Sequence, residues 1–349
     1  MSSPDFPEKS TKDTDDKGKL GTFGGVFTPS ILTILGIILF LRLGYVTGSG
    51  GVARAMVIIG LANLITILTS QSLAAIATNL KVKGGGDYYL ISRTLGKEFG
   101  GAIGLVLYLA QSVSVAFYCI GFTEAISAIL GPAAPLSPQL IGVAAMGAIF
   151  TLAMIGADWA TKFQYVVMML LAAALLSFFI GGIPQWQGEM LIANWAPGNP
   201  SESFWVIFGI FFPAVTGFTQ GVSMSGDLKD PAKSLPLGTF MGVGLSIIIY
   251  VGVVIVFAGV LPNRTMVEDY MAIKQVARYD FLIDAGVIAA TLSSAMASFL
   301  GGPRILQSLA ADKVFPLLTP FAKGAGSTNN PRRAVCMTCA IAFTGIMMG

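Results

Sequence analysis

Nine stretches of this chain are long, apolar and almost free of charged side chains, and they limit what it can fold into. A helix needs about 20 mainly apolar residues to cross a bilayer. Only 11% of the 349 residues are charged, whereas about a quarter are charged in a soluble protein. The chain is therefore predicted to be an all-α polytopic membrane protein. The predicted spans are 23–47, 52–79, 101–130, 138–156, 161–183, 204–225, 236–260, 282–300 and 334–349.

Composition excludes several other classes of function. The net charge is only +3 and no basic patch carries interleaved aromatics, so no nucleic-acid partner is expected. The chain has no histidine and three cysteines, and it shows no phosphate-binding loop or nucleophile–base pair. GGGDYY at 84–89 fits a connection between spans 2 and 3, with an interfacial helix that helps to close an inner gate. We therefore expect no enzyme activity and no cofactor or resident metal.

The two ends of the chain and its basic residues predict the orientation. The first 20 residues hold nine charges and no apolar signal-peptide core, so 1–21 are predicted to form a disordered cytoplasmic tail before a transporter domain at 22–349. Of the Lys and Arg residues, 16 lie in connections on the N-terminal side and four on the other side. Basic residues concentrate on the cytoplasmic side, which puts the N-terminus there. The last apolar segment runs to the chain end, so we expect a longer protein in which a tenth span follows.

Spans 1 and 6 contain helix-breaking residues at related positions. Span 1 includes Pro29 and Gly36, and span 6 includes Pro213 and Gly217. Five spans separate them, as an inverted repeat of five helices requires, and paired interruptions of this kind indicate a binding site at the middle of the membrane. Ordinary Pro and Gly kinks are the alternative.

A broken helix offers two kinds of ion site. Its carbonyl end suits a cation, and the N–H groups that begin the next half suit an anion. Span 1 would supply carbonyls at 32–35 and amides at 36–38, and span 6 a carbonyl at Pro213, a hydroxyl at Thr216 and amides at 217–219. No charged side chain lies at either break, which favours a small inorganic substrate.

Four long segments carry a resemblance to a known family. They are GTFGGVFTPSILTILGIILFLRLGYVTGSGG, IATNLKVKGGGDYYLISRTLGKEFGGAIG, FFPAVTGFTQGVSMSGDLKDPAKSLPLGT and ATLSSAMASFLGGPRILQSLAADKVFP. They resemble the cation-chloride cotransporters of the amino acid–polyamine–organocation superfamily, which have the LeuT-type fold. The match runs from about Gly21 to NNPRR at 329–333, and it looks closer to the sodium-dependent Na-K-Cl branch.

The resemblance implies a set of ion sites. It places potassium at Thr33, Ile34, Tyr118, Pro213 and Thr216. It places the two chlorides at Gly36, Ile37 and Ile38 and at Gly217, Phe218 and Thr219. It places sodium at Leu32, Leu35, Ala290, Ser293 and Ser294. Animal sodium-dependent members have Asn and Trp where this chain has Thr33 and Leu35, and the second chloride site of the family also uses a tyrosine from a tenth span.

Two charged residues within spans predict an outer gate. Arg42 lies about two helical turns beyond Leu35, and Glu124 lies six residues beyond Tyr118. Both spans run outward, ionisable residues within spans usually pair, and the family carries an Arg and a Glu at these places. We therefore predict an Arg42–Glu124 pair that closes the outer vestibule.

The function implied is electroneutral symport of chloride with sodium and potassium by alternating access. The alternatives are an amino acid or polyamine permease of the same superfamily, a sodium-independent potassium–chloride symporter, an ion channel and a non-transporting fragment. No repeated filter motif favours the channel. The expected partners are the inorganic ions and the lipid bilayer of the plasma membrane, and since the family commonly dimerises, a homodimer is left open.

Overall fold

The computed structural model of the chain describes residues 20–79, 86–131, 137–155, 158–223, 225–325 and 329–348, without the side chains at 155, 158–162 and 227. All but the last two residues of the predicted tail at 1–21 therefore lie outside the described residues. Within the described ranges the chain is helical, and two isolated β-bridges stand in place of strands. The predicted all-α fold is confirmed.

Each of the nine predicted spans contains helix. Span 1 comprises η1 (Phe23–Phe27), α1 (Thr28–Ile34) and α2 (Ile37–Leu41), and span 6 comprises α9 (Phe204–Phe211), η3 (Phe212–Thr219) and α10 (Gln220–Ser223). The other spans are α3 (Leu43–Asn79), α5 (Lys97–Leu130), α6 (Pro138–Ile155), α7 (Asp158–Gly182), α11 (Pro231–Val260), α14 (Asp280–Ala311) and α15 (Arg332–Met348).

Span 8 is longer than predicted. The predicted span ends at 300, but α14 continues through Pro303 to Ala311. Gly and Pro are tolerated inside membrane helices, because neighbouring helices and polar side chains satisfy the backbone groups that they free. Gly301 and Gly302 are both buried against the rest of the bundle, which explains why small residues occur there.

Within the described part of the chain, seven helical segments are long and apolar enough to cross a membrane, and α6 and α15 fall outside this set. Large apolar side chains are exposed along the outer faces of these helices, among them Leu64 and Leu68 of α3 and Val106 and Val113 of α5. A soluble protein rarely exposes apolar surface of this extent. These faces fit contact with lipid chains, so the chain is an integral membrane protein.

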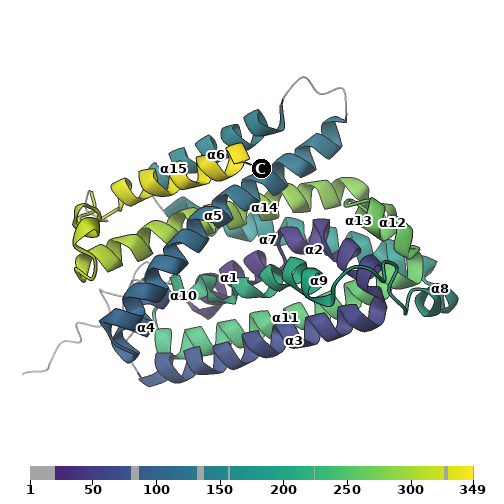
Figure 1. Cartoon of the computed structure of the whole chain (residues 1–349), viewed down its shortest axis with the longest axis horizontal. Coiled ribbons are helices and arrows are strands. Elements are labelled where there is room, and N and C mark those ends of the chain that lie inside the picture. The colour runs from purple at the N-terminus through teal and green to yellow at the C-terminus, as the bar shows by residue number, and fades with distance from the viewer. Residues whose placement is uncertain are drawn as a thin grey trace, which may run out of the picture.

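Span 1 forms the centre of the bundle. In the most apolar part of Phe23–Leu41, 94% of the residues are buried, against 33–67% for the other six long segments. Figure 1 shows α1 and α2 enclosed between α3 and α11 on one side and α5 and α14 on the other. An apolar helix that is buried all round belongs to the core, so groups exposed by a break in span 1 face protein rather than lipid.

Short helices close the two ends of the bundle. At one end lie α4 (Gly86–Thr94), η4 (Ser225–Asp227) and η5 (Pro316–Phe321), and we call it the α4 end. At the other lie η2 (Ile183–Gln185), α8 (Gly188–Ala193), α12 (Asn263–Glu268) and α13 (Ile273–Val276), and we call it the α12 end (Figure 1). The helix predicted between spans 2 and 3 is thus present as α4.

A tight turn at Gly51 divides the long helix α3. Residues 43–50 continue span 1, and residues 52–79 form span 2. Gly51 has φ 67° and ψ 168°, a conformation that favours glycine. Its α-carbon also lies against the backbone of Ala196 and Pro197, where a side chain would collide. The turn therefore sets the direction in which span 2 leaves the central span.

Candidate functional site

The helix of span 1 is interrupted at Leu35 and Gly36. Leu35 has φ −82° and ψ 38°. Gly36 has φ −88° and ψ −144°, so neither residue continues the helix. The end of one helix leaves carbonyl oxygens without intrahelical partners, and the start of the next leaves N–H groups free. The break lies where the sequence predicts it.

Span 6 is distorted in a different way. Its middle, Phe212–Thr219, is wound as a 3₁₀-helix between α9 and α10. In a 3₁₀-helix each N–H donates to the carbonyl three residues earlier. The amides of Gly217, Phe218 and Thr219 therefore have partners within the helix, whereas the sequence-based expectation treats them as free. A 3₁₀ stretch within a longer helix often marks a hinge.

The two distorted segments touch each other at Gly217. A β-carbon at this position would lie 2.6 Å from Thr33 Cγ2 and 2.7 Å from Thr33 Cβ. Only glycine permits this approach without a shift of one helix. Behind the break, Tyr250 of α11 donates a hydrogen bond to the carbonyl oxygen of Ile34 at 2.6 Å. Tyr250 could not be predicted from the sequence, because a single tyrosine in an apolar span has no pattern that indicates its partner.

A small cavity of about 70 Å³ lies between the two distorted segments. A water molecule occupies at least about 10–15 Å³ by this measure, so the cavity has room for several water-sized ligands. The described residues that line it carry no charged side chain. All five residues predicted to bind potassium line it, together with two of the residues predicted to bind chloride. The lining residues are Thr33, Ile34, Ile37, Ile38, Ser114, Phe117, Tyr118, Pro213, Ala214 and Thr216.

Hydroxyl and carbonyl oxygens supply the polarity of this cavity. The Thr33 hydroxyl donates to the carbonyl of Pro29 at 2.8 Å, and the Thr216 hydroxyl donates to the carbonyl of Pro213 at 2.9 Å. A hydroxyl that donates one hydrogen bond still has lone pairs for a cation. The Tyr118 ring packs edge-on against Phe117, with ring centroids 5.6 Å apart. The cavity therefore presents neutral oxygen ligands, which suit an alkali cation.

The residues predicted to bind chloride fall into two groups. Ile37 and Ile38 line the cavity at the start of α2, next to Gly36. Phe218 and Thr219 lie at the far end of η3, and the Phe218 carbonyl accepts a hydrogen bond from Ser30 of α1 at 2.9 Å. The second group thus lies closer to the α4 end than the first.

Two of the residues predicted to bind sodium, Leu32 and Ser294, lie beside Gly36. A β-carbon on Gly36 would lie 3.5 Å from the Ser294 hydroxyl and 3.6 Å from the Leu32 carbonyl oxygen. Ser294 is 1% exposed, and its hydroxyl has no hydrogen-bond partner among the described residues. Thr291 on the same helix does bond back to its own backbone, at 2.8 Å from the Val287 oxygen. A buried hydroxyl without a partner is unfavourable, so the Ser294 oxygen is available for a ligand.

The other three residues predicted for sodium are also buried. Leu35 is 2% exposed at the break, and Ala290 and Ser293 are 0% and 3% exposed on α14. Ala290 lies one helical turn before Ser294, so its carbonyl and the Ser294 hydroxyl share one face of α14.

The structure brings Arg42 and Glu124 together at the α12 end. Arg42 Nη2 lies 2.7 Å from Glu124 Oε1 and 2.8 Å from Oε2. Both side chains are about one-third exposed, at 32% and 31%. They line a larger pocket of about 350 Å³, which Tyr270 also lines. The ion pair therefore forms part of the wall of this pocket.

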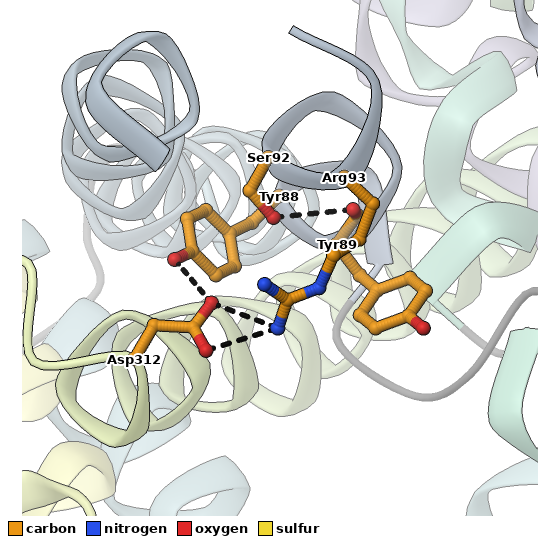
Figure 2. A network of polar contacts seen from close by, with 5 residues as sticks. All are labelled: Tyr88, Tyr89, Ser92, Arg93 and Asp312. Atoms are coloured by element: carbon orange, nitrogen blue, oxygen red, sulfur yellow. Dashed lines mark hydrogen bonds and ion pairs between the residues drawn. The ribbon is translucent and has the colours of Figure 1, made fainter. Parts of the chain in front are cut away.

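A second polar network lies at the α4 end (Figure 2). Arg93 Nη2 of α4 donates to both oxygens of Asp312 at 2.9 and 3.1 Å, and Tyr88 donates to Asp312 Oδ2 at 2.8 Å. Burial opposes ionisation of Asp312, but the hydrogen bonds from Tyr88 and Arg93 outweigh it and hold the pKa of this carboxyl below its usual value. This network could not be predicted from the sequence, because more than 200 residues separate α4 from Asp312.

Comparison with known proteins identifies relatives along the whole chain. A family model described as "Amino acid permease" matches residues 25–349. Solute carrier family 12 member 8 of Mus musculus is 34% identical over 339 residues, which cover 94% of this chain and 48% of that protein. Solute carrier family 12 member 2 of Squalus acanthias is 33% identical, over 99% of this chain and 34% of that protein. The chain thus spans about half or less of the length of these relatives.

A solved structure supports the architecture. The substrate-bound, outward-open state of a Na⁺-coupled sialic acid symporter matches with a TM-score of 0.59. The match covers 95% of this chain and 74% of that one at 14% sequence identity. At this identity the likeness concerns the fold alone, and it confirms the predicted transporter fold.

Proposed function

The chain belongs to the amino acid permease family, and we propose that it is a secondary active symporter that moves chloride with sodium and potassium by alternating access. Its relatives in solute carrier family 12 confirm the predicted resemblance to the cation-chloride cotransporters. The family consists of membrane transporters, and the proposal adds the identity of the ions.

The observation that carries the proposal is the cavity between spans 1 and 6. Its volume of about 70 Å³ is well below the roughly 300–1,000 Å³ typical of pockets for organic ligands. The described lining residues also carry no charged side chain to pair with the ammonium or carboxylate groups of an amino acid or polyamine. Neutral oxygens in a small cavity favour inorganic cations.

The unpartnered Ser294 hydroxyl supports sodium as one of these cations. It lies beside the break in span 1, near the Leu32 carbonyl, and it is buried on the central face of α14. A compact shell of oxygens suits Na⁺, and these two groups supply part of it. A sodium-independent potassium–chloride symporter would not need this hydroxyl.

The proposed cycle opens the cavity to one side at a time. The α12 end is closed by Arg42 and Glu124 in our proposal, and it faces outward because the Lys and Arg count places the N-terminus and the α4 end in the cytoplasm. The membrane concerned is the plasma membrane. Both assignments rest on the sequence and on the family.

The test is ion-dependent uptake by the full-length protein in proteoliposomes. We expect rubidium-86 uptake that requires both sodium and chloride on the same side. Uptake that proceeds equally well without sodium would replace this proposal by the potassium–chloride symporter. Uptake of labelled amino acids without rubidium uptake would replace it by the permease.

A further inference from the structure

Tyr250 of α11 contacts the break in span 1 although it is not among the described residues that line the cavity. Its hydroxyl donates to the Ile34 carbonyl oxygen at 2.6 Å, and this hydrogen bond is buried. Ile34 is the last residue of α1, so its carbonyl is one of those that the end of a helix leaves without intrahelical partners. Ile34 also lines the cavity and is one of the residues predicted to bind potassium. Tyr250 therefore holds a predicted cation ligand from outside the cavity.

The phenol group of Tyr250 has a fixed position. Its side chain is 0% exposed, and its ring packs edge-on against Phe211 of α9, with ring centroids 5.2 Å apart and the ring planes at 80°. Tyr250 also lies within α11, which continues from Pro231 to Val260. A hydroxyl carried by a packed ring on a continuous helix can fix the place of the oxygen to which it donates.

The helix α11 lies against span 1 at several points before the break. A β-carbon on Gly238 would lie 2.6 Å from Val26 Cβ, and one on Gly242 would lie 3.8 Å from Ser30 Cβ. A helical side chain reaches back over the turn before its own α-carbon, so Tyr250 continues this row of contacts to the end of α1. α11 thus supports the first half of span 1 up to the carbonyl that precedes the break.

The hydrogen bond leaves room for a cation on the same oxygen. A carbonyl oxygen has two lone pairs, and Tyr250 uses one of them. Hydrogen bonds polarise the groups that make them, so a carbonyl that already accepts a proton attracts a cation less strongly. Selectivity between potassium and sodium depends on the size of the site and on the field strength of its carbonyls. An oxygen that is both fixed and weakened favours the larger cation.

The two predicted cation sites differ in this respect. Beside Gly36, near the Leu32 carbonyl, the Ser294 hydroxyl has no hydrogen-bond partner among the described residues, so its oxygen is free to approach a small ion. In the neighbouring cavity, the Ile34 carbonyl is held by Tyr250. The break in span 1 thus carries one oxygen without a partner at the predicted sodium site and one restrained oxygen at the predicted potassium site.

We propose that Tyr250 is a positioning residue that makes the cavity select potassium over sodium, because it fixes the Ile34 carbonyl and weakens its attraction for a small cation. The inference rests on the proposed function, since it assumes that potassium binds in the cavity. Without the hydrogen bond, the carbonyl attracts cations more strongly and can move inward around sodium. Potassium loses a ligand at its preferred distance, whereas sodium gains one, and both changes lower the preference for potassium.

The substitution Tyr250→Phe removes the hydroxyl and keeps the ring that packs on Phe211. Loss of an outer hydrogen-bond partner costs a metal site about 10–100-fold in affinity. We expect the lower end of this range, about tenfold, because an alkali cation binds several neutral oxygens and only one of them changes. The preference for potassium over sodium should fall by about the same factor.

The experiment measures two concentrations in proteoliposomes that contain the full-length protein. The first is the rubidium concentration that half-saturates rubidium-86 uptake, with chloride constant and sodium saturating its own site. The second is the additional sodium that competes with rubidium and halves this uptake. The ratio of the second concentration to the first reports selectivity, and it should be about tenfold lower in Tyr250→Phe than in the wild type.

The matched control is Ser246→Ala, one helical turn before Tyr250 on α11. Ser246 is 1% exposed and donates to the Val243 carbonyl of its own helix at 2.8 Å, so its removal costs a buried hydrogen bond away from the break. It should keep the wild-type ratio. An unchanged ratio in Tyr250→Phe, or an equal change in Ser246→Ala, overturns the assignment of Tyr250.

A second variant covers the case in which Tyr250→Phe does not fold. Replacement of Tyr250 by 3-fluorotyrosine keeps the size of the side chain and makes its hydroxyl a stronger donor, so the ratio should rise above the wild-type value. A ratio at or below that of the wild type overturns the assignment. If the wild type takes up no rubidium-86 under any ionic condition, the proposed function itself fails, and the two failures are thereby distinguished.

Discussion

The substitution Ser294→Ala is expected to make the protein more stable without sodium and less stable with it. Ser294 is 1% exposed on α14, and its hydroxyl lacks a hydrogen-bond partner among the described residues. In our proposal this oxygen binds sodium together with the Leu32 carbonyl. Removal of the hydroxyl therefore has opposite effects in the two states.

The magnitudes follow from the burial of this group. An unsatisfied buried hydroxyl costs about 1–3 kcal/mol, so the variant should gain roughly 1 kcal/mol in sodium-free buffer after a small loss of packing. Sodium at one hundred times its dissociation constant stabilises the wild type by about 2.7 kcal/mol, and a variant that binds sodium weakly forfeits most of this. The order of the two unfolding temperatures should therefore reverse when sodium is added.

The assay is thermal unfolding of the full-length protein in detergent, with potassium and chloride fixed and sodium replaced by an organic cation. Ser246→Ala is the matched control, because Ser246 is also 1% exposed but donates to the Val243 carbonyl at 2.8 Å. It should lose about 1 kcal/mol in both buffers. If Ser294→Ala lowers the unfolding temperature and keeps the full sodium shift, the hydroxyl is not a sodium ligand and the reasoning is refuted.

Substitutions at three further places test the other parts of the site. Tyr118→Phe should raise the potassium concentration needed for half-maximal uptake, since it removes one oxygen from the cavity, and an unchanged value would exclude Tyr118 as a ligand. Arg42→Glu and Glu124→Arg should each lower uptake several-fold. Because the two side chains are only 2.7 Å apart, the variant that carries both exchanges should restore part of the uptake. No restoration in the double variant would argue against the gate. Gly217→Ala should destabilise the protein by about 1–3 kcal/mol through overpacking and abolish uptake. Its control, Gly209→Ala in the same span, meets nothing within 4 Å and should be tolerated.

The break in span 1 could be predicted from the sequence, whereas the form of span 6 could not. Gly36 interrupts an otherwise apolar run, and the backbone leaves the helical region there. Pro213 and Gly217 give a similar signal, yet the segment is wound as a 3₁₀-helix. Pro and Gly weaken a helix locally, but contacts elsewhere decide the resulting conformation. The close approach of Gly217 to Thr33 is one such contact.

Contacts between distant segments set a second limit on the prediction. The ion pair of Arg42 with Glu124 could be anticipated, because two charges within spans must find partners and the family carries both. Tyr88, Arg93 and Asp312 lie at water-facing ends of their helices, where charged residues are common and imply no partner.

One ion pair lies at each end of the bundle, Arg42–Glu124 at the α12 end and Arg93–Asp312 at the α4 end. The strengths of these two ion pairs fit a transporter that must open each end in turn. Both ion pairs are partly exposed, with side chains at 32% and 31% for Arg42–Glu124 and at 34% and 17% for Arg93–Asp312. Ion pairs at such exposure contribute only about 0–1 kcal/mol each. Either ion pair therefore breaks at small cost, and the binding energy of a few ions is enough to shift the balance between two states that differ by a few kcal/mol.

The centre of the bundle is different, because the hydrogen bond from Tyr250 to the Ile34 carbonyl is fully buried and its loss would leave that carbonyl unsatisfied. Weak contacts at the ends and a buried hydrogen bond at the centre would allow the ends to move while the proposed ion ligands keep their geometry.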